Sequence, residues 1–402
     1  MNGLKTWAAA ALAAAGCALS ASSLAAAPVF TILHTFSADD GSLLTGSPIL
    51  ASDGNLYGTA SEGGSSGGGT LWRLAADGNF TVLHAFVAGK KAPEGNQPEG
   101  RLLQASDGLL YGVTRGGGTD LVGTVFRIAP DGSGYTVLHS FPRDHRIGWA
   151  PQYGLVQAAD GNFYGTTSSH ADLTSECAAG IDVGCGAVFR MAPDGTVTPV
   201  HRFEPTTEGF APAGPLVVGK DGNLYGANLY GGSTLCLGAI GCGSLYRVGL
   251  DGKFRLLHVF QGTDGANPVG AISRGATDKL YGATGAGGAT DAGTAFSLSP
   301  DGTIQPLHEF TSTKPVGSPL TGLTVGLDGN LYGAASYLGQ GIHGAAEQGD
   351  LYRLRTSGKV TLLQPKVMVP DAMTLAPDGS FYGVSSKFGG TSFVFKMLEP
   401  AK

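Results

Sequence analysis

The stretch Asp53-Gly54-Asn55-Leu56-Tyr57-Gly58 occurs in seven near copies along this chain of 402 residues. Successive copies are separated by about 50 to 60 residues, a period typical of repeat architectures rather than of a string of unrelated domains. The tyrosines of the copies are Tyr57, Tyr111, Tyr164, Tyr225, Tyr281, Tyr332 and Tyr382.

The second repeat shows how one unit folds. It contains four short runs rich in apolar and β-branched residues, separated by Asp-Gly pairs or by a glycine-rich loop, and these predict four antiparallel strands. The runs are 100–105, 109–113, 123–128 and 135–141. Asp-Gly is a turn signal because Gly accepts positive φ and Asp caps such turns. A calcium loop is the alternative for these pairs, but its spaced acidic ligands and terminal Glu are missing.

Seven such units predict an all-β fold. A single four-stranded sheet cannot bury both of its faces, whereas seven sheets arranged radially bury each face against a neighbour. We therefore expect a seven-bladed β-propeller of four-stranded antiparallel blades. The last repeat ends after its third strand, at 393–397, while residues 29–36 copy the fourth strand of the other repeats. We expect this N-terminal strand to complete the last blade, which removes two exposed sheet edges.

A second signature lies in the last two strands of the repeats, for example in Gly69–Leu74, Gly123–Ile128 and Leu83-His84-Ala85-Phe86. Together with the Leu-Tyr-Gly phrase it resembles the GloVer tandem repeat, found in exported bacterial proteins whose termini often bear different surface anchors. The resemblance covers nearly all of the expected mature chain. It implies a repeat domain of largely uncharacterised role, with no family catalytic residues to carry over.

Residues 1–27 have the layout of a secretory signal. Lys5 is followed by an apolar stretch and then by small residues from Ser20 to Ala27. We expect export, with 28–402 as a single propeller domain. The run Ala14–Cys17 also resembles a bacterial lipoprotein box, so a lipid on Cys17 is the alternative to simple removal of the signal.

The opposite end of the chain carries no sign of an anchor. Lys402 follows the last blade strand directly, so we expect no C-terminal anchor, and no later segment is long and apolar enough to span a bilayer. Free secretion and the Cys17 lipid remain the two expectations.

Composition narrows the partners. A net charge of −6 and a pI near 5.8 argue against nucleic acid, whose binding depends on clustered Lys and Arg. No phosphate loop, nucleophile elbow or metal-binding helix is present in the sequence. We therefore expect no cofactor, a monomer, and a polysaccharide or a cell-envelope protein as the partner.

Four cysteines follow the leader. In an exported protein an even count and short separations favour local disulfides, here Cys177 with Cys185 and Cys236 with Cys242. A zinc site shared by all four is the alternative, although the spacings are not those of zinc knuckles.

The irregular loops predict which face is functional. In a propeller, the turns between first and second and between third and fourth strands share one face, and here they are tight Asp-Gly turns. The remaining connections are long and share the other face, where a rigid scaffold usually presents binding residues. The long segments are 60–69, 114–122, 167–185, 228–242, 284–292 and 335–348, with the interblade segments 87–99, 142–152, 204–213 and 261–268.

Residues that recur in nearly every blade are expected to be structural. Six histidines share one place in the fourth strand and predict a repeated hydrogen bond. The same interpretation applies to the seven tyrosines and to five arginines of the third strand. The histidines are His34, His84, His139, His201, His258 and His308, and the arginines are Arg73, Arg127, Arg190, Arg247 and Arg353.

Residues that break the repeat are the candidates for function. His145, His170 and His343 lie outside the recurring position, in predicted loops. Around the first of them, an acid, two cations and an aromatic ring could hold an acidic sugar, since Arg pairs with a carboxylate and Trp covers a sugar's apolar face. A solvated charge cluster is the alternative. The group comprises Arg143, Asp144, Arg146 and Trp149, joined by Arg115, Asp172, Tyr230 and Tyr337.

Two functions compete. The first is a noncatalytic exported binding or surface-interaction module, for a glycan or an envelope protein. The second is a polysaccharide lyase, in which a His or Tyr removes the proton next to a uronate carboxylate while Arg neutralises the developing charge. Its candidates are His145, His170, Tyr230 and Arg146. Glycoside hydrolysis would need two carboxylates about 5 to 9 Å apart, and a purely structural spacer remains open as well.

Overall fold

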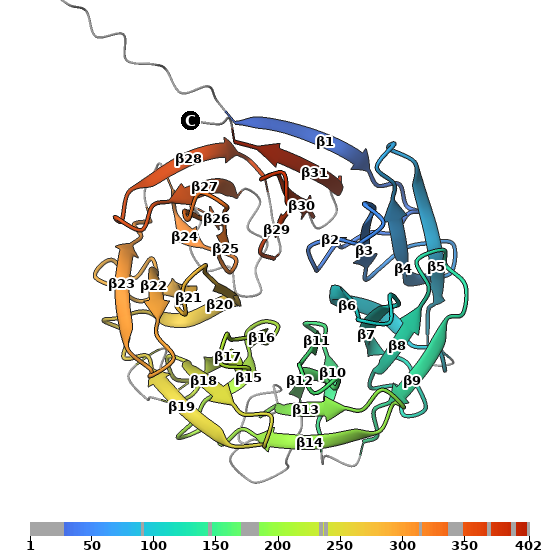
Figure 1. Ribbon diagram of the computed structural model, residues 1–402, viewed down its shortest axis with the longest axis horizontal. Coiled ribbons are helices and arrows are strands. Elements are labelled where there is room, and N and C mark those ends of the chain that lie inside the picture. Colours follow the sequence, from blue (N-terminus) through green and yellow to red (C-terminus); the bar gives the residue numbers. More distant parts are fainter. Residues whose placement is uncertain are drawn as a thin grey trace, which may run out of the picture.

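The computed structural model describes residues 28–89, 92–143, 147–169, 185–232, 236, 240–312, 316–336, 349–367, 371–386 and 391–399. Within these ranges the regular structure is entirely β. The strands form seven antiparallel sheets arranged in a ring around a central axis (Figure 1), so the predicted seven-bladed β-propeller is confirmed.

The blades follow one another along the chain, each with its first strand at the centre and its last at the rim. Blade 1 contains β2 (Ile49–Leu50), β3 (Leu56–Ala60), β4 (Gly67–Leu74) and β5 (Phe80–Val87). Blade 2 contains β6 (Asn96–Gln104), β7 (Leu110–Gly116), β8 (Thr124–Ile128) and β9 (Thr136–Ser140). Blade 3 contains β10 (Trp149–Pro151), β11 (Val156–Gln157), β12 (Phe163–Ser169), β13 (Ala187–Met191) and β14 (Val197–Arg202).

The second half of the ring repeats this plan. Blade 4 contains β15 (Phe210–Pro212), β16 (Val217–Val218), β17 (Leu224–Tyr230), β18 (Ser244–Val248) and β19 (Phe254–Val259). Blade 5 contains β20 (Ala266–Arg274), β21 (Leu280–Ala286), β22 (Thr294–Leu298) and β23 (Ile304–Glu309). Blade 6 contains β24 (Ser318–Pro319), β25 (Thr324–Val325), β26 (Leu331–Ser336), β27 (Asp350–Leu354) and β28 (Val360–Pro365). Blade 7 contains β29 (Thr374–Leu375), β30 (Phe381–Ser385), β31 (Phe393–Leu398) and β1 (Val29–Thr35).

The two ends of the chain close the ring in blade 7. Strand β1 pairs antiparallel with β31, with Val29 opposite Leu398 and Thr35 opposite Phe393. The Phe30 ring stacks on Phe395, with centroids 4.9 Å apart. The predicted closure by the N-terminal strand is therefore confirmed.

The repeated phrase is explained by two contacts. Its Asp accepts a hydrogen bond from the hydroxyl of its Tyr, at 2.6 Å between Asp53 and Tyr57. Its final Gly lies beneath an aromatic ring of the next strand, because a Cβ on Gly58 would fall 2.2 Å from the Trp72 ring. Turn, tyrosine and glycine are thus one structural unit, as the sequence predicts.

The recurring histidines also hold the blades together. His201 stacks at 3.8 Å on Phe254, the first residue of the outer strand in the next blade, and its ring pairs with Glu208 at 2.7 Å. His34, His84 and His258 likewise pair with Asp40, Glu94 and Asp264. Burial alone would raise the pKa of Asp264, but hydrogen bonds from His258 and the Gln261 amide hold it below its usual range.

The innermost strands bend before they reach the channel. In blades 3, 4 and 6 this strand is split into two pieces that pair with the same neighbour. Gln97, Ala150, Ala211 and Asn267, each of which precedes a proline, have φ between 53° and 55°. This bend departs from the single straight innermost strand that the sequence predicts for each blade.

Candidate functional site

A cavity of about 570 Å³ runs along the propeller axis and is lined by residues from the innermost strands of all seven blades. One end lies at the beginning of these strands, on the face with the long loops, and is lined by Arg101 and Tyr153. The other end lies beside the Asp-Gly turns, near Gln104 and Arg274. We call the first end the channel mouth.

One cation marks the channel mouth. The positions equivalent to Arg101 in the other blades carry small side chains, namely Ser47, Gly154, Pro215, Ala271, Gly322 and Ala372. Among the described residues, the Arg101 guanidinium has no hydrogen-bond or ion-pair partner, and its electrostatic interaction is with Asp371. Burial lowers the pKa of Arg101 while Asp371 raises it, yet an Arg side chain keeps its charge at neutral pH.

Two further residues at the mouth replace a glycine of the repeat. Tyr153 and Asp371 occupy the position that is Gly46 in blade 1 and Gly100 in blade 2. The Asp371 carboxylate accepts hydrogen bonds from the amides of Ala372, at 2.7 Å, and Ser47, at 3.4 Å. Burial raises the pKa of Asp371, although these amides and Arg101 act in the opposite direction.

Tyr153 is a neutral donor facing the cavity. Burial, with the nearby charges of Glu99 and Asp371, raises its pKa to about 12. Within the described part of the chain its hydroxyl has no hydrogen-bond partner, so it is available to a ligand in the cavity.

A buried carboxyl, Glu99, lies within electrostatic reach of Tyr153. Glu99 is 14% exposed and lies 3.6 Å from the Arg115 guanidinium, which is 53% exposed. Burial raises the pKa of Glu99 to about 7, against the opposing effect of Arg115. Both arginines stay charged, while burial raises the pKa values of Glu99 and Asp371, so the negative charge that opposes the arginines is lost at a higher pH than for exposed carboxyls.

The structure gathers two of the predicted site residues here. Arg115 and Tyr230 both lie within electrostatic reach of Tyr153. Burial raises the pKa of Tyr230, so neither tyrosine is suited to act as a base at neutral pH. A binding face at the central opening requires that residues which depart from the repeat lie close together there.

Two other predicted site residues, Arg143 and Trp149, lie against each other. The Arg143 guanidinium lies 5.0 Å from the centroid of the Trp149 ring, and its Nε donates to the Asp120 carbonyl at 3.0 Å. Trp149 also packs against the core between blades 2 and 3. A sugar stacking on this face of the ring would displace Arg143, and ligand binding by this pair stays a prediction.

The remaining candidates fall outside the described residues, and their roles stay predictions. They are Asp144, His145, Arg146, His170, Asp172, Tyr337 and His343.

Sequence reasoning missed Glu99, Arg101, Tyr153 and Asp371. A signal was present, because the equivalent positions in most blades carry small or apolar side chains, and these four residues are among the few exceptions.

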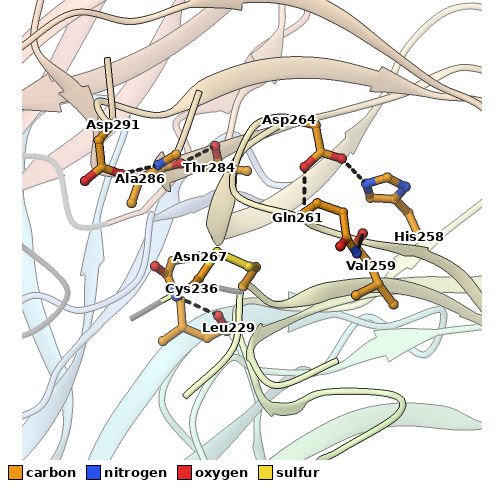
Figure 2. The surroundings of a disulfide bond; sticks show 12 residues. Leu229, Cys236, His258, Val259, Gln261, Asp264, Asn267, Thr284, Ala286 and Asp291 are labelled. Carbon is orange, nitrogen blue, oxygen red and sulfur yellow. Dashed lines mark hydrogen bonds and ion pairs between the residues drawn. A yellow bond between two sulfur atoms is a disulfide. The ribbon is translucent and has the colours of Figure 1, made fainter. Parts of the chain in front are cut away.

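One predicted disulfide is confirmed. Cys236 bonds to Cys242 with Cα atoms 5.1 Å apart, which rules out a zinc site that shares these two as thiolates. Figure 2 shows this bond beside Asn267, whose amide donates to the Leu229 carbonyl at 3.0 Å. Cys185 is also disulfide-bonded, and its predicted partner Cys177 lies outside the described residues.

The described residues contain neither a membrane-spanning helix nor a cluster of metal-ligating side chains. No helix there is long and apolar enough to cross a bilayer. No group of three or more His, Cys, Asp or Glu side chains in the same ranges is placed to hold a metal ion.

The closed ring and its repeat signatures define a seven-bladed tandem-repeat propeller. The sequence matches the Gloeobacter/Verrucomicrobia repeat over residues 20–176, 94–240 and 173–396, and the chain belongs to this family. The predicted family resemblance is thereby confirmed. No curated protein matches the sequence.

Solved structures share the fold at low identity. An oligogalacturonate lyase in complex with manganese has a TM-score of 0.58 at 13% identity, covering 92% of this chain and 93% of the other. A protein assigned as a 6-phosphogluconolactonase from Bacteroides uniformis has a TM-score of 0.52 at 16% identity, covering 82% and 88%. At such identities the likeness shows the fold alone.

Proposed function

We propose that this protein is an exported binding module that takes a carboxylate-bearing ligand at its channel mouth. The observation that carries this proposal is Arg101, a cation that breaks the repeat and, among the described residues, has no ion-pair partner. A guanidinium recognises a carboxylate through two parallel hydrogen bonds, and Tyr153 adds a neutral donor beside it.

An acidic glycan is the ligand class to test first. Uronate units carry a carboxylate on each ring, which an Arg can bind through two parallel hydrogen bonds. Export by the predicted leader and the alternative lipid on Cys17 belong to this proposal, and the confirmed disulfide supports an oxidising compartment.

Calorimetric titration of residues 28–402 with galacturonate oligomers and with neutral galactose oligomers tests the proposal. We expect the acidic oligomers to bind and the neutral ones to bind at least tenfold more weakly. Arg101→Gln should lower the affinity for the acidic oligomers about tenfold or more, since hydrogen bonds to charged groups contribute about 1.5–3 kcal/mol.

Arg274→Gln is the matched control, because Arg274 lines the opposite end of the same cavity. It should leave the affinity within about twofold of the parent. Equal affinity for charged and neutral oligomers, or an Arg101→Gln variant that binds like the parent, would refute recognition at the mouth.

A lyase remains the second candidate, and the raised pKa of Glu99, within electrostatic reach of Tyr153, favours it. A carboxyl whose pKa is about 7 is suited to accept a proton at neutral pH. It would take the proton next to a uronate carboxylate as the bond to the leaving oxygen breaks, with Arg101 neutralising the charge and Tyr153 protonating the leaving oxygen. Absorbance from unsaturated sugar ends, abolished by Glu99→Gln, would support it, and no product with binding retained would exclude it.

A further inference from the structure

Next to the mouth, the cavity is lined by a ring of side chains that we call the waist, which stand two residues after the Arg101 position in each blade. Four of these are aliphatic, Ile49, Leu103, Val156 and Val217, and three carry hydroxyls, Ser273, Thr324 and Thr374. The cavity contacts all of them except Thr374.

The three hydroxyls are already engaged. Ser273 donates to the Leu323 carbonyl, Thr324 to the Met373 carbonyl at 2.7 Å, and Thr374 to the Pro48 carbonyl. Each bond joins one blade to the next around the ring. The waist therefore offers no free side-chain hydroxyl to a ligand.

The next ring toward the Asp-Gly turns is mixed. Leu50, Val218, Val325 and Leu375 line it together with Gln104 and the charged Arg274. The Gln104 side-chain amide in this ring accepts a hydrogen bond from the Ser52 backbone amide at 2.8 Å and donates one to the Gly108 carbonyl at 3.2 Å. Both of its polar atoms are therefore bonded to residues of the turns. The charge of the cavity is thus concentrated at its two ends.

We infer that the channel binds an amphiphilic carboxylate, with its head at Arg101 and Tyr153 and an unbranched alkyl or aryl body in the waist. This inference rests on the proposed function and specifies the ligand class of the same site. A volume of about 570 Å³, aliphatic side chains in the waist and a few converging polar groups are typical of small-molecule sites. A sugar ring, with hydroxyls on every side, would find no free side-chain hydroxyl in the waist.

The test is a titration of residues 28–402 with straight-chain carboxylates from butanoate to decanoate, below their micelle concentrations, with the matching alcohols and with galacturonate. We expect the affinity to rise up to about fourfold per added methylene until the chain fills the waist. Each carboxylate should bind more tightly than its alcohol, and Arg101→Gln should abolish that difference while leaving the gain per methylene.

A double variant, Val156→Thr with Val217→Thr, adds two hydroxyls to the waist at nearly constant volume. It should reduce the gain in affinity per added methylene about twofold or more. Thermal melting checks that the variant is folded. Val87→Thr, at an exposed position on the outer strand β5, is the matched control and should change nothing.

The possible outcomes separate the two proposals. Galacturonate binding with no dependence on alkyl chain length would overturn the amphiphile and leave the proposed function standing. Absence of binding by every carboxylate would overturn both. An unchanged gain per methylene in the double variant would place the alkyl body outside the waist and also overturn the inference.

Discussion

At the scale of single residues, the channel mouth depends on departures from a repeat. Arg101, Tyr153 and Asp371 occupy positions that are small in most blades, and Glu99 is buried beside Arg115. Such departures are informative because the scaffold is complete without them. The sequence alone shows that these residues depart from the repeat. They lie close together only because the ring brings blades 2, 3 and 7 to one axis.

Glu99 gives the first residue-scale prediction. The fold raises the pKa of the Glu99 carboxyl from 4.5 to about 7. Protonated Glu99 therefore adds its full contribution to the free energy of unfolding below the unfolded-state pKa of 4.5, and this contribution is lost as the pH rises through 7. Glu99→Gln should therefore become more stable relative to the parent between pH 5 and pH 8, by on the order of 2–3 kcal/mol. Chemical denaturation at both pH values measures this.

The control is Glu62→Gln, because Glu62 is exposed. Its stability difference from the parent should not change with pH. A parallel pH dependence in the two variants would contradict a buried, mostly protonated Glu99.

At the scale of elements, the strands and their turns could be predicted because Asp-Gly pairs and apolar runs are local signals. The bend of the innermost strands could not, since Gln97 and Ala150 give no local sign of positive φ, and the residue before a proline favours extended backbone. Contacts between neighbouring blades impose this conformation. The bend is also what brings Glu99 and Arg101 to the mouth.

Close approach of neighbouring innermost strands gives a second prediction. Gly100 has φ +70°, and a Cβ there would lie 2.4 Å from the Gln152 carbonyl oxygen of the next blade. Gly100→Ala should cost about 2–4 kcal/mol of unfolding free energy through clash and backbone strain. Gly108 in the Asp-Gly turn also has positive φ but nothing within 4 Å.

Gly108→Ala therefore measures the cost of backbone strain without a clash, and we expect it to lower the free energy of unfolding by about 1 kcal/mol. Urea denaturation of both variants separates the cost of the clash from the cost of backbone strain. Equal losses would mean that the innermost strands do not approach as closely as described.

At the scale of the whole molecule, sheet number and closure were predictable because the seventh repeat lacks a fourth strand and residues 29–36 supply it. Figure 1 shows β1 lying along β31 where the two ends of the chain meet. Ring closure brings the beginnings of all seven innermost strands to one end of the axial cavity, and this end holds the candidate binding site. The ligand could not be predicted, because no contiguous motif encodes the channel lining.

Closure gives a third prediction. Phe30→Ala removes the ring that stacks on Phe395 and should lower the unfolding free energy by roughly 2 kcal/mol. Ile32, on the same strand but 51% exposed, is the control, and Ile32→Ala should cost less than about 1 kcal/mol. Thermal melts that rank the two variants in the reverse order would contradict the role of β1.

The measurement that tests the account most directly is a crystal structure of residues 28–402 grown with 6-bromohexanoate, with anomalous scattering used to locate the bromine. The account predicts one bromine peak inside the axial cavity among Leu103, Val156 and Val217, with the carboxylate within hydrogen-bond distance of Arg101. A channel holding only water, or bromine bound on the face of the Asp-Gly turns, would contradict it.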